Sequence, residues 1–146
     1  MSDFIDFLSS LSDEEWSTRT DAEGWPVAVT AHHVAMGARF CSDLAVHVGE
    51  GGDITWTSEF IDSANEQHAQ AFADVGAEDV MSALKEQLPE VSTKIRSLSA
   101  EQLARQVETP RNYGEGDVRS AGDVVQKMLI DHIEGHLESI KSTARA

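Results

Sequence analysis

Residues 124–141 read VVQKMLIDHIEGHLESIK, and this stretch decides the fold class. An α-helix has 3.6 residues per turn, so each residue is rotated by about 100° from the one before it. With this rotation one face of the segment is apolar, formed by Val125, Met128, Leu129, Ile133, Leu137 and Ile140. The opposite face is polar, formed by Asp123, Lys127, Asp131, Glu134, Glu138 and Lys141. The pattern predicts an amphipathic helix from about Ala121 to Thr143, packed through its apolar face.

Two histidines, His132 and His136, lie near the middle of the apolar face. Residues four apart are stacked neighbours on a helix, close enough to hold one ion between them. A buried imidazole without a partner is costly, so the pair predicts either a shared hydrogen-bond network or a metal ion. The spacing leaves both interpretations open. Gly135 adds little bulk beside the pair, and we expect it to let another helix or a ligand approach closely.

The rest of the chain has the same helical character. Apolar residues at helical spacing predict further helices in residues 3–11, 26–48, 55–75 and 80–98. Pro26 opens the second of these at its first helical position, and Pro89 is a candidate kink in the fourth. Ser12 to Glu15 has the form of a capping box and predicts a short extra turn. A polar loop is expected over 108–122, and no useful alternating strand pattern occurs, so we expect one all-α domain over 1–146, a helical bundle with extra short helices.

A metal site on the last helix would need a third protein ligand, because zinc, nickel and iron sites usually have at least three. The predicted helix 26–48 carries His32, His33 and His47. By the same rotation His33 shares a face with apolar residues, namely Val29, Met36, Phe40 and Leu44. His32 lies on a more polar flank, with Ala28, Ala35 and Arg39. His33 is therefore the better inward candidate, and we predict a site of His33, His132 and His136.

Other potential ligands are assigned to different roles. His47 lies fourteen residues beyond His33, roughly 21 Å along a continuous helix, so we expect it at the surface or at the helix end. Cys41 lies about 12 Å from His33 along the same helix and is expected in the core. His68 is expected in a core or surface position. Each ligating imidazole also needs an acceptor for its second N–H, for which the candidates are Asn65, Gln67 and Glu134.

Composition restricts the partners. Eleven Lys and Arg against 26 Asp and Glu give a formal net charge of −15, which disfavours nucleic acid because it repels phosphate. The N-terminus has no signal-peptide pattern, and no apolar run approaches the ~20 residues that span a bilayer. A cytoplasmic protein without membrane contact is expected. A homodimer is compatible with the pattern, although no apolar stripe requires one.

Several motifs, taken in order, resemble the DinB-like superfamily, which includes the N-terminal domains of mycothiol-dependent maleylpyruvate isomerases. The motifs are LSDEEW (11–16), GWPVAVTAHHVA (24–35), IDSANEQHA (61–69), LKEQLPEVSTKIRSLSAEQL (84–103) and SAGDVVQKMLIDHIEGHLESI (120–140). The resemblance implies an up-down-down-up four-helix bundle. It also implies a divalent metal on one histidine of the second helix, which aligns with His33, and on a pair that aligns with His132 and His136.

The resemblance further implies a metal-dependent enzyme, often a transferase or isomerase that uses a low-molecular-weight thiol such as mycothiol or bacillithiol. A hydrolase is the second kind of enzyme expected. For each kind the expected metal is zinc, nickel or iron, and the expected substrate is a small molecule. Two alternatives stay open: a metal- or ligand-binding stress or sensor module without turnover, and a structural bundle with a buried histidine network. Trp25, Trp56, Arg111 and Tyr113 are candidates for the mouth of a pocket because they lie at helix ends or in the long loop.

Overall fold

The computed structural model describes residues 2–108 and 120–144. Its elements are α1 (Ser2–Leu8), α2 (Asp13–Ser17), α3 (Val27–Gly49), α4 (Ser58–Ala71), α5 (Ala77–Ser97), α6 (Ala100–Leu103), α7 (Ala121–Asp123), the π-helix η1 (Val124–Ile130) and α8 (Asp131–Ala144). The described ranges contain no strand, only two isolated bridges, Arg19–Pro26 and Gln106–Ser120. The predicted all-α fold is confirmed.

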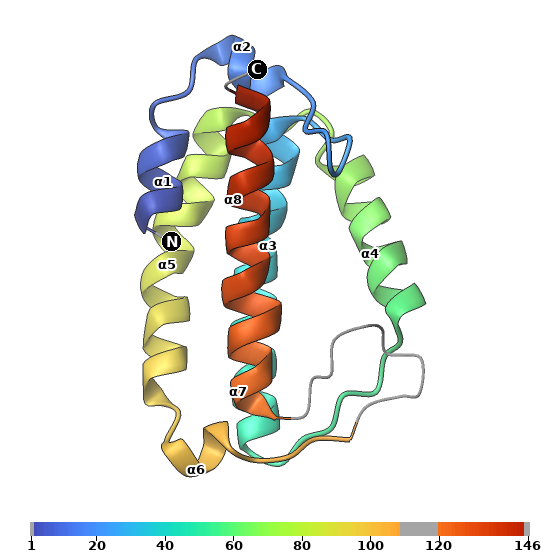
Figure 1. Cartoon of the computed structure of the whole chain (residues 1–146), viewed down its shortest axis with the longest axis vertical. Helices are drawn as coiled ribbons and strands as arrows, with labels where there is room; N and C mark the ends of the chain where they lie inside the picture. Colours follow the sequence, from blue (N-terminus) through green and yellow to red (C-terminus); the bar gives the residue numbers. More distant parts are fainter. Residues whose placement is uncertain (1, 109–119, 145–146) are drawn as a thin grey trace.

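The helices form a bundle around α3 (Figure 1). The first helix, α1, and the last, α7–η1–α8, run in one direction, whereas α3 and α5 run in the other, which is the expected up-down-down-up order. The central helix, α3, contacts α5, η1 and α8. Every residue from 27 to 35 is buried, because neighbours surround this end of α3 on all sides. Any imidazole placed there points into the protein.

The core lies along α3 and is filled from the helices around it. Phe4, Leu8, Val34, Leu84 and Ile140 are all less than 2% exposed, and they come from α1, α3, α5 and α8. The short N-terminal helix contributes to this core, because Phe4 and Leu8 are buried and α1 contacts α5.

Helix ends follow the predicted caps closely. The Ser12 side chain accepts from the backbone N–H of Glu15, and Glu15 accepts from the Ser12 backbone, so the predicted capping box is present. Pro26 is the N-cap of α3 and not its first helical residue, a shift of one position. The predicted polar loop lies mostly in residues 109–119, outside the described residues.

The crossover helix α4 stands to one side of the bundle (Figure 1). It contains no buried residue, and Phe60 on its first turn is 59% exposed. Its apolar residues therefore form the wall of a cavity and are not part of the core.

The last helix is not regular throughout. Residues 124–130 are π-helical, and the Asp131 N–H donates to the carbonyl of Gln126, five residues back. The rotation of 100° per residue therefore does not hold in this segment, and Ile130 is 39% exposed. Regular α-helix resumes at Asp131, one residue before the first of the two histidines. No helix in the described ranges is both long enough and apolar enough to cross a membrane.

Candidate metal centre

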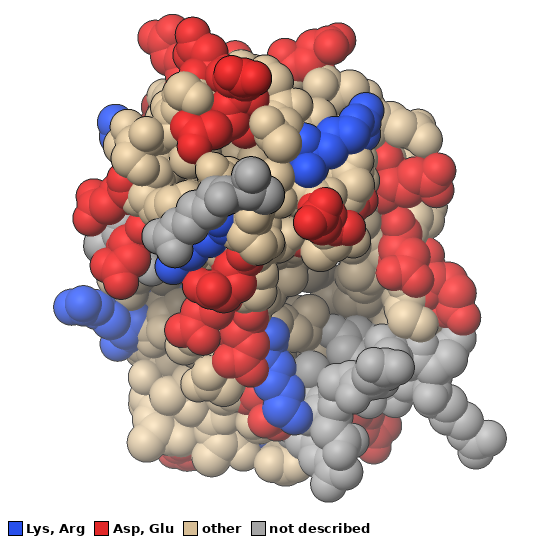
Figure 2. All heavy atoms as spheres, turned by 45° about the horizontal axis from the view of Figure 1, so that its top comes forward, with Lys and Arg blue, Asp and Glu red and all other residues tan. Residues whose placement is uncertain are grey.

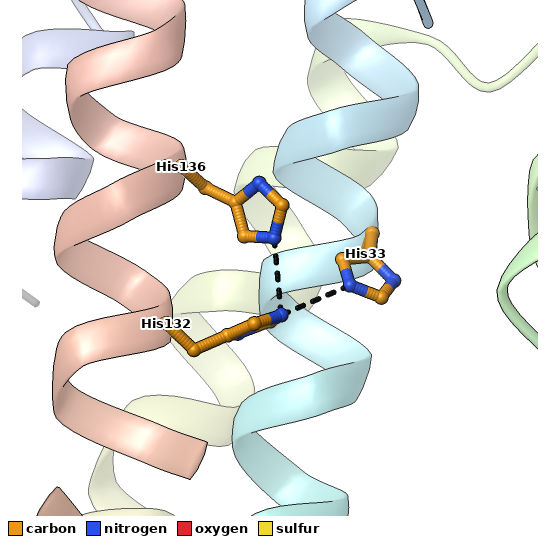
Figure 3. Close-up of side chains that lie close together, drawn as sticks. All are labelled: His33, His132 and His136. Atoms are coloured by element: carbon orange, nitrogen blue, oxygen red, sulfur yellow. Dashed lines mark hydrogen bonds between the residues drawn. The ribbon is translucent and has the colours of Figure 1, made fainter. Parts of the chain in front are cut away.

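His33 of α3 meets His132 and His136 of α8 in the interior of the bundle (Figure 3). The Nε2 atom of His132 lies 3.1 Å from Nε2 of His33 and 3.0 Å from Nε2 of His136. One donor atom from each of the three residues lies within 4.8 Å of the other two. The structure thus brings together all three residues of the predicted site, although His33 is 99 positions from His132 in the chain.

The spacing fits a shared ion. Two nitrogens that are each about 2.1 Å from one metal lie roughly 3.0–3.4 Å apart, between right-angle and tetrahedral geometry. The two short contacts of His132 lie within this range. Neutral imidazole nitrogen is also a donor that zinc, nickel and iron accept. The three histidines could therefore hold a divalent ion, and the donor set does not identify which one.

Glu23 fixes the orientation of His136. Its Oε1 is 2.7 Å from Nδ1 of His136, and its Oε2 accepts a 2.7 Å hydrogen bond from the hydroxyl of Ser139. Burial alone would raise the pKa of Glu23, but hydrogen bonds from Thr20, Ser139 and His136 outweigh burial, and its pKa is lowered. An ionised Glu23 accepts the N–H of Nδ1, which leaves the lone pair of His136 Nε2 directed at the other two histidines.

The hydrogen bonds of His132 are incomplete within the cluster. A neutral ring carries one N–H, so its Nε2 can donate to only one of its two neighbours. Its Nδ1 is buried and has no hydrogen-bond partner within the described residues. One buried nitrogen of this ring is therefore left unsatisfied in either tautomer, at a cost of about 1–3 kcal/mol. The unsatisfied Nδ1 does not distinguish a hydrogen-bond network from a metal site, because an ion held at Nε2 would leave the N–H of Nδ1 equally unpaired. The convergence of the three Nε2 atoms is the observation that favours an ion.

The environment keeps two of the rings uncharged. Burial, together with the positive charge of His132, His136 and His68 when these rings are protonated, lowers the pKa of His33 to about 3, and Glu23 opposes the shift. Burial and His136 lower the pKa of His132 to about 4. Both rings are neutral at pH 7, so their lone pairs are available to a metal without the loss of a proton.

Two cavities adjoin the three histidines. The first, of about 510 Å³, we call the chamber; it is lined by His33, Met36, Gly37, Phe40, Cys41, Phe60, Ile61, Ala64, Asn65, His68, Lys127, Met128 and His132. The second, of about 420 Å³, we call the vestibule; it is lined by Glu23, Trp25, His33, Asp62, Asn65, Glu66, His132 and His136. The chamber wall is mainly apolar, whereas three carboxylates line the vestibule. Asn65 borders both cavities.

The remaining ligand candidates lie elsewhere, as predicted in two cases. His47 is exposed, with Nε2 3.3 Å from the carbonyl of Asp53. Cys41 is buried, its Sγ donates to the carbonyl of Met128 at 3.1 Å, and burial raises its pKa to about 12. A thiol with that pKa is not ionised at neutral pH and is a poor nucleophile.

The prediction for His32 was wrong. It is 7% exposed instead of lying on a polar flank, because α4 covers that side of α3. Its ring stacks on His68 at 5.1 Å with an interplanar angle of 22°, and on Phe72 at 4.1 Å. His68 also meets the edge of His33 at 5.4 Å. His68 therefore packs beside the site but does not belong to the group of three histidines.

Sequence reasoning missed Glu23, the acceptor that the structure provides. Of the three predicted acceptors, Glu134 is exposed, Gln67 donates to Ser63 at 3.2 Å, and Asn65 lines the cavities. Glu23 lies 113 positions before His136, and nothing in the local sequence indicates the contact.

Of the pocket-mouth candidates, two lie within the described residues. Trp25 lines the vestibule with its ring at 5.5 Å from His33, and Trp56 packs against Phe40 at the same distance. Arg111 and Tyr113 lie outside the described residues.

The close approach of another helix that was expected at Gly135 is not found, because nothing lies within 4 Å of the place where a Cβ would be. The close approach is made instead by Gly37 of α3. A Cβ at Gly37 would lie 3.3 Å from Cε1 of His132. The bundle therefore needs its small residue on α3, facing the ring, and not beside the two histidines on α8.

Fold and site together define a class: helical bundles with a three-histidine centre that could hold a metal. The chain belongs to the DinB superfamily, whose family model matches residues 2–140. The resemblance inferred from the motifs is thereby confirmed at the level of the superfamily. Comparison with curated proteins and with solved structures gave no match.

Proposed function

We propose that this protein binds one divalent metal ion on His33, His132 and His136 and acts on a small molecule held in the chamber. The observation that carries the proposal is the convergence of three Nε2 atoms at the wall of an apolar cavity of about 510 Å³. Three protein ligands leave coordination positions for a reactant, which is typical of catalytic sites and not of closed structural ones.

The residues around the centre have distinct roles. Glu23 holds His136 in the ligating tautomer, and Ser139 holds Glu23. The apolar side chains of the chamber exclude water from the reactant. A divalent ion at the centre would supply a Lewis acid that lowers the pKa of a water molecule or thiol held there. Cys41 cannot supply that thiol, because its buried Sγ donates to Met128.

The nucleophile is therefore external to the chain. With a low-molecular-weight thiol such as mycothiol or bacillithiol, the reaction would be a transfer or isomerisation; with water it would be a hydrolysis. The same centre without turnover would be a ligand sensor, and a search for product formation separates the two. Among the charged side chains on the face seen in Figure 2, acidic ones predominate, which supports a small-molecule partner over nucleic acid.

Metal content tests the proposal first. Protein purified without a histidine tag is analysed by plasma mass spectrometry for zinc, nickel and iron, beside His33→Ala and His132→Ala. His47→Ala is the matched control, because His47 is an exposed histidine on the same helix. We expect about one ion per chain in the wild type and the control, and almost none in the two site variants with helicity retained.

No metal in the wild type, and no uptake of added zinc, nickel or iron, would refute the proposal. A positive result justifies screening thiols and electrophiles in the presence of the identified metal.

A further inference from the structure

The wall of the chamber has an unusual surface for a protein in water. Of the large hydrophobic side chains that are exposed in the described ranges, Met36, Phe40 and Phe60 all line this cavity, with 38%, 42% and 59% of their surface accessible. Ile61 and Met128 extend the same apolar wall. Large apolar side chains gathered around a cavity indicate a surface that a bound molecule covers.

The chamber has the dimensions of a ligand site. Its volume of about 510 Å³ lies within the range of roughly 300–1,000 Å³ that small-molecule sites occupy. It lies between α3, α4 and η1, and His33 and His132 form part of its wall. A molecule in the chamber therefore touches the metal centre, which the flat surface of a second protein could not reach.

Charge around the centre restricts the occupant further. Among the residues that the structure describes, Lys127 is the only lysine or arginine that lines the two cavities, and it forms an ion pair with Asp123 at 4.0 Å. Glu23, Asp62 and Glu66 line the vestibule on the other side of the histidines. A ligand whose body carried negative charge would be repelled by these carboxylates, so an uncharged or cationic body is favoured. The charge of a divalent ion would accommodate an anionic donor atom at the centre itself.

We infer that the ligand of this centre is a small molecule with an apolar, uncharged or cationic body that lies in the chamber, and with a metal-binding group at the end that faces His33 and His132. The inference rests on the proposed function for the metal-binding end alone. The apolar body is recognised by Met36, Phe40, Phe60, Ile61 and Met128, whether or not a metal is bound. Sugar-like, hydroxyl-rich molecules would not cover this apolar wall. The chamber therefore suits the apolar substrate of the proposed reaction, and not a polar thiol that would react with that substrate.

The first arm of the test uses metal-free protein and the neutral apolar fluorophore N-phenyl-1-naphthylamine. We expect saturable binding with enhanced fluorescence, weakened roughly fivefold by Phe60→Ser because part of the aromatic contact is lost. Ile130→Ser is the matched control: Ile130 is also exposed, at 39%, but lines a separate groove with Leu88 and Val91. Equal binding to wild type and Phe60→Ser would place the probe elsewhere and overturn the inference.

The second arm uses cobalt-loaded protein and n-alkyl hydroxamates, whose tails run from methyl to hexyl. Binding is followed through the visible absorption of cobalt. Each methylene buried in the chamber should strengthen binding by up to about fourfold, until the tail leaves the cavity. Phe60→Ser should flatten this series, and Ile130→Ser should not.

The outcomes separate the two ideas. If cobalt binds and hydroxamate affinity is independent of tail length, the inference fails while the proposed metal site stands. If no metal binds but the fluorophore is held and is sensitive to Phe60→Ser, the proposed function fails and the apolar site stands. Light scattering accompanies both arms, because probe binding that appears only with a change in mass would indicate a dimer interface and overturn the small-molecule assignment.

Discussion

Two groups of histidines lie side by side in this bundle, and they differ in how their nitrogens point. His33, His132 and His136 meet with ring planes at 64°, 78° and 86° to one another, and three Nε2 atoms converge (Figure 3). His32 and His68 are also close, with Nδ1 and Nε2 3.4 Å apart, but their rings stack at 22°. Ring lone pairs lie in the ring plane, so stacked rings cannot direct both at one ion.

The difference shows that proximity of imidazoles does not by itself make a metal site. The first group is held by a partly buried carboxylate, Glu23, which fixes one tautomer. The second is held by packing against Phe72 and by a hydrogen bond between His68 and the backbone of Val29. Histidine count and spacing would treat the two groups alike.

The sharpest test of this comparison removes one histidine from each group. His136→Ala should weaken metal binding by more than about 100-fold, beyond the range for loss of an outer partner, because a ligand is lost. His68→Ala should leave the affinity unchanged. Competition with a chromophoric chelator measures both. Comparable losses in the two variants would mean that the stacked pair also takes part in binding.

Acid should lower the stability of the metal-free protein through His33 and His132 of the first group. The pKa of His33 is about 3 and that of His132 about 4, against 6.5 for an unperturbed histidine. The unfolded chain therefore binds more protons than the folded chain between about pH 6.5 and those values. Stability falls as the pH is lowered through this window, by up to about 1.4 kcal/mol per pH unit for each histidine. The loss levels off below the two folded-state pKa values.

Urea unfolding at pH 7, 6 and 5 in the presence of a chelator measures this slope. His132→Leu removes one of the two groups and should make the slope shallower by up to about 1.4 kcal/mol per pH unit. Groups that do not contact His132 contribute equally to both proteins, so the difference reports His132 together with its effect on the pKa of His33. Parallel slopes would contradict the assignment of an uncharged, buried ring.

The next largest effect on metal affinity is expected from the loss of Glu23, the carboxylate that contacts His136 of the first group. Glu23→Ala removes the acceptor from His136 Nδ1, and such outer partners typically account for 10- to 100-fold in metal affinity. Ser139→Ala should cost less, because Glu23 would keep its bond to His136. Titration with the metal found in the purified protein checks the order. An affinity unaffected by Glu23→Ala would show that packing alone orients His136.

The fold was predictable from the sequence where helices bury a continuous apolar face. Apolar residues recur along α3, α5 and α8 with the period of an α-helix. The existence and approximate bounds of these three helices therefore follow from the pattern. The pattern could not reveal that the apolar residues of α4 line a cavity, since burial in a core and exposure to a chamber select similar side chains. The π-helical turns of η1 were equally hidden, because they depend on backbone hydrogen bonds that side-chain periodicity does not record.

The site, like the fold, could be predicted from the sequence only in part. His33, His132 and His136 could be selected because each lies on an apolar helix face, where burying a polar ring is costly unless the ring has a partner. Glu23 could not be found, because it lies in a loop and reaches His136 only through the tertiary fold. His32 was misplaced because the angular argument ignores the helix that covers its flank. Contacts between distant segments are what the sequence left undetermined.

The two glycines give the smallest and most local test. Gly135 lies in open space, so Gly135→Ala should raise the free energy of unfolding by roughly 1 kcal/mol, the helix-propensity difference, without changing metal affinity. In Gly37→Ala the same gain is offset by contact of the new Cβ with His132 at 3.3 Å. Because the ring must move by a few tenths of an ångström, we expect less stabilisation and a severalfold weaker metal site. Equal affinities in the two variants would show that the His132 ring tolerates displacement, and that its contact with α3 does not help to place the converging nitrogens.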